Sequence, residues 1–299
     1  MDLGGDSMPY SDDEEDPELI PDVIPLVCKF LSIPDIKKCR FVSKSWHVGA
    51  THALKLRTQI GIEFHPENST DHDVVAEKLK FCPVNIDIKF SYKYSQREYV
   101  EPSFDPKTFD PVRKMKSISI QFLTPHHVQW QKDSVLRLIR MSPTSLQRLQ
   151  FKWENYHVFP SLCGKSFSKL KRLEISYPAQ LRNESLERIG HAVTEAFTAI
   201  EQIQIETRHL LELGKAGFLK NFPGSLNTLE LFGGLDNNNM ECLLEIPGPL
   251  KKLAFYAIKL DHNDDLISEI PTIMYTLLKK HSLSLENLCI DILPHTQLG

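Results

Sequence analysis

Apolar residues recur in one short pattern through most of the chain. The segments LQRLQF, LKRLEI and LNTLEL share the template L-x-x-L-x-L, in which apolar and polar positions alternate at the end. Such alternation is typical of a short strand with one buried face. Nine copies of the template, some of them weak, start at Arg57, Pro83, Met115, Leu146, Leu170, Ile200, Leu226, Leu250 and Leu285. Successive starts are 24 to 35 residues apart, which leaves room for a return segment after each strand.

Several of the segments between these strands have helical spacing of their apolar residues. Glu184 to Ile200, Asp133 to Met141 and His209 to Phe222 each predict a helix. Asp264 to Lys280 predicts another, broken near Pro271. The chain is therefore expected to alternate strands with helix-like return segments.

Repeats of this length and pattern predict a leucine-rich-repeat solenoid. Because one repeat cannot bury its own apolar face, the repeats must stack. We therefore predict an α/β fold in which residues 57–299 form about nine divergent repeats, with a parallel sheet on the concave face and helical return segments outside. An ordinary doubly wound α/β domain is the alternative. The shared strand template and the nearly regular intervals disfavour it.

A different pattern precedes the repeats, between Glu18 and Leu54. It contains three short helical segments, the first opened by Pro21. Ser32, with Asp35 three residues later, and Ser43 are predicted N-caps of the second and third helices. A module this small rarely buries a stable core alone, so we expect a partner to cover it. An N-terminal cap on the larger domain is the simpler alternative.

The order of landmarks in this module resembles the F-box. The resemblance rests on Ile20-Pro21, Phe30-Leu31, Asp35-Ile36 and the Val42-Ser43-Lys44-Ser45-Trp46 run, with Cys39-Arg40 between the last two. It covers about the first sixth of the chain and implies a three-helix F-box over residues 17–56. Pro25 departs from the pattern, because it removes a backbone donor one turn into the expected first helix.

Together with the repeats, the resemblance implies the substrate receptor of an SCF-type E3 ubiquitin ligase. In that family the F-box binds a Skp-type adaptor, which connects to a cullin scaffold and a RING subunit, and the repeats hold the protein substrate. The adaptor-facing residues implied are Ile20, Pro21, Ile24, Val27, Leu31, Pro34, Ile36, Val42 and Trp46. Some of them must instead pack the interior of the F-box, and the sequence does not separate the two groups.

The repeats place a second set of candidate residues on the concave face, between the core positions of the strands. The substrate-binding candidates are Arg148, Gln150, Lys152, Arg172, Glu174, Gln204, Glu230, Phe232, Lys252 and Tyr256. Mixed charge beside two aromatics suits a protein surface better than a nucleic-acid backbone, which selects a basic stripe. The plainer alternative is that many of these are solvated strand residues. The aromatic segment 90–111 either forms another interface or packs over the end of the solenoid.

Composition and motif searches favour a binding protein over an enzyme. Gly164-Lys165-Ser166 lacks the earlier glycine of a phosphate-binding loop, and no zinc or dinucleotide fingerprint occurs. No catalytic residue, metal or cofactor is predicted. The first sixteen residues, MDLGGDSMPYSDDEED, predict a disordered acidic tail. The cysteines are scattered, and the sequence shows neither a signal peptide nor an apolar membrane span. We therefore predict a cytoplasmic or nuclear protein. We also predict that it binds neither membrane nor nucleic acid. A repeat scaffold without a ligase role, or an enzyme whose site lacks a signature, stays open.

Overall fold

The chain forms two compact units, Met1–Thr58 and Gln59–Gly299. The computed structural model describes residues 23–64, 75, 77–79, 83–90, 114–122, 129–152, 162, 164–176, 195–207, 210–215, 217–234, 237–258 and 270–292. The predicted acidic tail and the first F-box landmark, Ile20-Pro21, lie outside these residues. Each unit is described below by itself.

The described part of the first unit, residues 23–58, contains three helices: α1 (Val23–Cys28), α2 (Ile33–Cys39) and α3 (Lys44–Arg57). Both predicted N-caps are confirmed. The Ser32 hydroxyl accepts a hydrogen bond from the Asp35 backbone N–H at 3.3 Å and donates to the Asp35 carboxylate at 2.5 Å. The Ser43 hydroxyl accepts from the Trp46 backbone N–H, also at 3.3 Å. Each cap satisfies a backbone donor that the first turn of its helix leaves without a partner.

Residues from all three helices form the core of this unit. The fully or nearly buried members are Ile24, Cys28, Ile36, Ala50, Ala53 and Leu54. The Arg57 guanidinium donates hydrogen bonds to the carbonyl oxygens of Cys28 at 2.8 Å and Leu31 at 2.5 Å. Because carbonyls at a helix end lack intrahelical donors, Arg57 stabilises the end of α1 from the end of α3. Pro25 lies in the first turn of α1 as described, where a backbone N–H has no intrahelical acceptor, so it does not break the helix.

A glycine allows α1 and α3 to approach closely, and its replacement provides a test of this packing. A Cβ atom at Gly49 would lie 2.6 Å from Ile24 Cγ2 and 2.9 Å from Ile24 Cβ. We expect Gly49→Ala to destabilise the first unit by about 2 kcal/mol, although Ala is the better helix former, because Ile24 is fully buried and cannot move away. Urea unfolding followed by Trp46 fluorescence, in a chain carrying Trp130→Phe and Trp153→Phe, measures this change.

Ile24→Leu provides the matched control, because it removes the Cγ2 methyl group that the new Cβ atom would meet. We expect the double variant with Gly49→Ala to recover part of the lost stability. A Gly49→Ala chain as stable as the parent would show that α1 and α3 do not pack at this distance.

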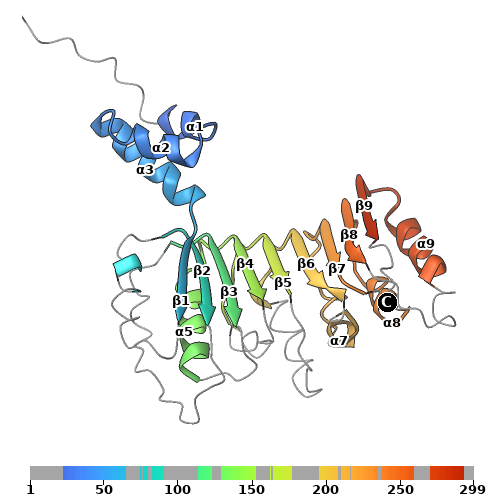
Figure 1. Ribbon diagram of the computed structural model, residues 1–299. Helices are drawn as coiled ribbons and strands as arrows, with labels where there is room; N and C mark the ends of the chain where they lie inside the picture. Colours follow the sequence, from blue (N-terminus) through green and yellow to red (C-terminus); the bar gives the residue numbers. More distant parts are fainter. Residues whose placement is uncertain are drawn as a thin grey trace, which may run out of the picture. The chain divides into compact units, whose positions relative to one another are not determined.

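In the described residues of the second unit, nine strands form one parallel sheet. The strands are β1 (Ile60–Phe64), β2 (Asn85–Phe90), β3 (Ser117–Phe122), β4 (Arg148–Lys152), β5 (Arg172–Ile175), β6 (Gln202–Glu206), β7 (Thr228–Phe232), β8 (Lys252–Ile258) and β9 (Asn287–Ile292). Their order in the sheet is their order in the chain (Figure 1). Each strand begins two or three residues after its predicted template start. This sequential order confirms the α/β solenoid and excludes a doubly wound sheet, whose strand order reverses.

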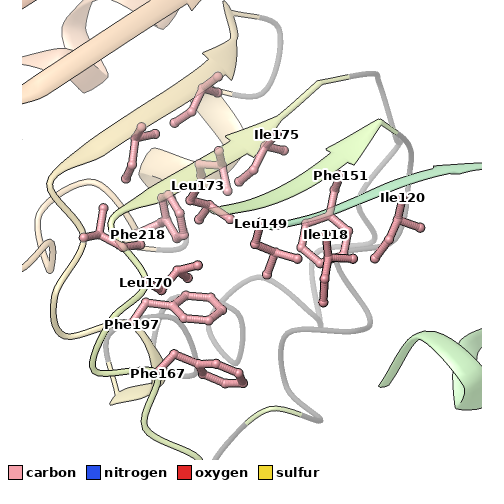
Figure 2. Close-up of a cluster of buried hydrophobic side chains, with 14 of the residues drawn as sticks. Ile118, Ile120, Leu149, Phe151, Phe167, Leu170, Leu173, Ile175, Phe197 and Phe218 are labelled. Carbon is pink, nitrogen blue, oxygen red and sulfur yellow. The ribbon is translucent and has the colours of Figure 1, made fainter. Parts of the chain in front are cut away.

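The register aligns core positions with core positions across the sheet. Ile118 of β3 pairs with Leu149 of β4, and Ile120 pairs with Phe151. Leu149 pairs in turn with Leu173 of β5. Figure 2 shows these side chains in one buried cluster with aromatics from the return segments, including Phe167 and Phe197, whose ring centroids are 5.4 Å apart. One continuous core therefore runs through the repeats, as stacking requires.

Four described helices return the chain between strands. They are α5 (Gln129–Arg140), α7 (Leu210–Lys215), α8 (Asn237–Leu243) and α9 (Ile270–His281), and each adds buried residues to the same core. Helices were predicted at α5, α7 and α9. Pro271 is the second residue of α9 as described, where a proline is tolerated, and the part of the predicted helix before Ile270 lies outside the described residues. Most of the predicted helix from Glu184 to Ile200 lies outside the described residues.

An imidazole buried at the end of α9 predicts a response of the repeats to acid. His281 is almost fully buried, and its Nδ1 accepts a hydrogen bond from the Leu250 backbone N–H at 3.3 Å. Within the described part of the chain, its Nε2 makes no hydrogen bond. Burial, with the Lys280 ammonium nearby, lowers the His281 pKa below its ordinary value of 6.5. The folded state therefore favours neutral imidazole. This contribution to stability is present above pH 6.5 and is lost as the pH falls below it.

We expect His281→Gln to flatten the fall in repeat stability between pH 7 and pH 5, by about 1 kcal/mol. Gln removes the titration while retaining an oxygen that can accept from Leu250. Urea unfolding at both pH values, followed by circular dichroism, measures the difference. Parallel pH profiles for the parent and the variant would contradict the assignment to His281.

Candidate functional site

The side chains between the core positions form a second face of the sheet, which we call the polar face. Its members align across strands in two rows. One row contains Arg148, Arg172, Gln202, Thr228 and Lys252, and the other contains Gln150, Glu174, Gln204, Glu230 and Ala254. Nearly all predicted substrate-binding residues thus lie in register on neighbouring strands.

Glu174 is buried on the floor of the polar face. Its side chain is 2% exposed, although it occupies a position expected to face solvent. Arg148 on the neighbouring strand places Nη2 2.8 Å from Glu174 Oε1. Arg172, two residues earlier on the same strand, donates from Nε to the same oxygen. The two guanidinium groups cover the carboxylate and neutralise it.

Arg172 extends from Glu174 to a second buried carboxylate two strands away. Its Nη2 donates to Gln204 Oε1 at 3.1 Å and lies 3.5 Å from Glu230 Oε2. Lys252 donates to Glu230 Oε1 at 2.7 Å. The Glu230 carboxylate, and after it the Tyr256 hydroxyl, holds the Lys252 pKa above its ordinary value. We call these five charged residues, Arg148, Arg172, Glu174, Glu230 and Lys252, the charge network.

An aromatic pair lies beside the charge network. The rings of Phe232 on β7 and Tyr256 on β8 stack with centroids 5.0 Å apart and planes 29° apart. Lys252, Ala254 and Tyr256 alternate along the same side of β8. Ala254 alone separates Lys252 from Tyr256 on this side of the strand, and it is fully buried. The aromatic pair therefore adjoins the lysine end of the charge network.

The other candidates on or near this sheet are placed as follows. Gln150 is half-buried on β4 next to Glu174 in register. Lys152 ends β4, and its side chain is outside the description. Of the aromatic segment 90–111, only Phe90 is described. It is buried and stacks on Phe64 with centroids 5.0 Å apart, so it belongs to the core.

Two buried polar atoms on β2 and β3 were not predicted from the sequence. Asp87 and Ser119 are register neighbours on the polar face. Among the residues that the structure describes, Asp87 Oδ1 and Ser119 Oγ have no hydrogen-bond partner. Their template position marked them as polar-face residues. Nothing in the sequence marked them as buried.

The structure separates the predicted adaptor residues of the first unit into distinct groups. Ile24 and Ile36 are fully buried in the unit's own core, so they offer no surface in this conformation. Leu31 and Trp46 are partly buried against that core. Val27 is also half-buried, whereas Pro34 and Val42 are exposed. Ile20 and Pro21 lie outside the described residues.

Large apolar side chains are exposed on the first unit, several of them not predicted. Phe30 is 89% exposed in the turn after α1, and Phe41 is 90% exposed in the turn before α3. Leu26, Val42 and Val48 are exposed as well. Helical periodicity did not indicate Phe41, because this residue lies in a turn. Its position next to Val42, a landmark of the F-box resemblance, could have predicted it as part of the exposed apolar surface.

Positive charge accompanies this apolar surface. From residue 29 to residue 57 the chain carries one acid, Asp35, and seven basic residues, which are Lys29, Lys37, Lys38, Arg40, Lys44, Lys55 and Arg57. The lysines among them are exposed. A partner for this surface would combine apolar contacts with acidic groups.

No model of a known protein family matches the sequence, and no curated protein sequence matches it. In the part of the chain that the structure describes, no group of three or more His, Cys, Asp or Glu side chains could hold a metal ion. None of the described helices has the length and apolar character needed to cross a bilayer.

Proposed function

We propose that this chain is the substrate-recognition subunit of an SCF-type ubiquitin ligase. In this role the first unit binds a Skp-type adaptor, through which it joins a cullin and a RING subunit, and the repeats bind the protein to be ubiquitinated. The receptor itself makes no covalent bond. It raises the effective concentration of a substrate lysine near the ubiquitin-charged enzyme.

The observation that carries this proposal is the exposed apolar surface of the first unit. A monomeric surface rarely leaves two phenylalanines about nine-tenths exposed without a binding role. Phe30 and Val42 are also landmarks of the F-box resemblance. The same two residues are therefore both motif positions and exposed apolar side chains. The flanking lysines favour an acidic partner.

The repeats support the receptor role through their polar face. A sheet of nine strands offers a long row of side chains at fixed spacing, a common basis for protein recognition by solenoids. The polar face carries arginines and a stacked aromatic pair, and these residue types often dominate the binding energy at protein interfaces.

Co-expression of the full chain with a Skp-type adaptor tests the proposal. We expect a one-to-one complex on size-exclusion chromatography and a higher soluble yield than the chain gives alone, because the adaptor covers Phe30 and Phe41. Adding the cullin and RING subunits should then yield an assembly that transfers ubiquitin to bound proteins. A chain that is monodisperse alone and ignores the adaptor would favour a repeat scaffold without a ligase role.

A further inference from the structure

The charge network presents only its cations to solvent. The Arg148, Arg172 and Lys252 side chains are 47%, 33% and 32% exposed, whereas Glu174 and Glu230 are 2% and 8% exposed. An approaching molecule therefore meets guanidinium and ammonium groups, with the carboxylates beneath them. The network has three cations and two anions, so one positive charge is left over.

Arg172 is held in place before any ligand arrives. Its guanidinium contacts acceptors on three successive strands, Glu174 on β5, Gln204 on β6 and Glu230 on β7. An arginine fixed in this way loses little side-chain entropy when it binds an anion. Three guanidinium nitrogens make no hydrogen bond to the described residues: Nη1 of Arg172, and Nε and Nη1 of Arg148. These donors remain available to an incoming carboxylate.

The aromatic pair lies at a defined distance from these donors. Phe232 and Tyr256 are two and three strands away from Arg172, and neighbouring strands are about 4.8 Å apart. Both aromatic residues also lie four residues further along the strand direction than Arg172, which is level with Thr228 and Lys252. The Cα separation is therefore roughly 16 to 20 Å, which an extended peptide covers in about five or six residues.

We propose that the polar face binds an acidic segment of a partner protein, with an Asp or Glu carboxylate on Arg148 and Arg172 and an aromatic side chain five or six residues away on Phe232 and Tyr256. This inference deepens the receptor role proposed above by naming the class of substrate segment. The single surplus charge and the buried carboxylates favour a short acidic motif over a nucleic-acid backbone, which needs a continuous basic stripe.

Binding of labelled peptides to the full chain, measured by fluorescence anisotropy, tests this proposal. The probe is a twelve-residue Gly-Ser peptide that carries a Glu pair and a Phe separated by five residues, made in both orders. We expect at least one order to bind, and its affinity to fall about tenfold when the Glu pair becomes Lys, when Phe becomes Ser, or when the separation becomes one residue, which is too short to reach both parts of the site. Raising the salt concentration should weaken binding.

Variants of the chain locate the site. We expect Arg148→Gln and Phe232→Ala each to weaken binding of the same peptide about tenfold. Arg148→Gln should keep the fold, because Glu174 retains Arg172. Lys171→Gln and Lys251→Gln are matched controls, since each removes one positive charge beside a network residue, from an exposed pair with Glu201 or Glu286. We expect neither control to change the affinity.

Three outcomes would overturn the proposal. The first is equal affinity for all peptides, and the second is a loss with Lys171→Gln as large as that with Arg148→Gln. The third is no binding of any of the peptides to the full chain. Because the adaptor is absent from this experiment, each of these failures leaves the proposed adaptor binding intact, and loss of adaptor binding leaves the peptide result intact.

Discussion

Replacing Phe30 and Phe41 together with Ala should weaken binding of a Skp-type adaptor about a thousandfold. Both side chains are almost completely exposed in the free chain, so they contribute little to its core. Burying a phenylalanine contributes about 2 kcal/mol, and two such anchors at the centre of an interface account for roughly this loss. Surface plasmon resonance with immobilised adaptor measures the affinity, and urea unfolding should show unchanged stability of the first unit.

A matched control comes from the repeat unit. Leu283 and Tyr275 are also exposed apolar residues, and replacing both with Ala makes a similar change far from the proposed adaptor surface in the sequence. We expect this control to bind the adaptor like the parent. Unchanged affinity of the Phe30 and Phe41 variant would show that the apolar surface of the first unit serves another partner.

The repeat architecture could be predicted from the sequence because alternation has a direct structural meaning. In a strand, neighbouring side chains point to opposite faces, so Leu149 and Phe151 marked the core and Arg148 and Gln150 marked the other face. The cap residues Ser32 and Ser43 were equally local signals. Helix α8 was missed because its short run, NNNMECL, has too few apolar residues to show a period.

Burial on the polar face could not be predicted, because it depends on side chains from neighbouring strands. The sequence assigned Glu174 and Glu230 to that face, but it did not indicate that Arg172 would connect them across β6. The same reasoning applies to the first unit. Helical spacing placed both Ile24 and Val27 on an apolar face, and only the packing of α3 against α1 decides that Ile24 is fully enclosed.

Replacing Arg172 with Leu should destabilise the repeats by about 3 kcal/mol, because it removes the cation that both buried carboxylates share. This is the lower end of the range for breaking a buried ion pair, since Glu174 keeps Arg148, Glu230 keeps Lys252, and Arg172 itself is partly exposed. Urea unfolding of the repeats at pH 7 measures the change. Arg148→Leu should cost less, about 1 kcal/mol, because Arg148 is more exposed and contacts only Glu174.

The physical cause can be separated from simple loss of packing by removing the buried charges as well. In a chain carrying Arg172→Leu, Glu174→Gln and Glu230→Gln, no carboxylate is left short of a cation, and the amides can still accept hydrogen bonds from Arg148 and Lys252. We expect this triple variant to recover most of the stability that Arg172→Leu loses. If it is as unstable as the single variant, the arginine stabilises the sheet through its contact area, and the two carboxylates tolerate burial with one cation each.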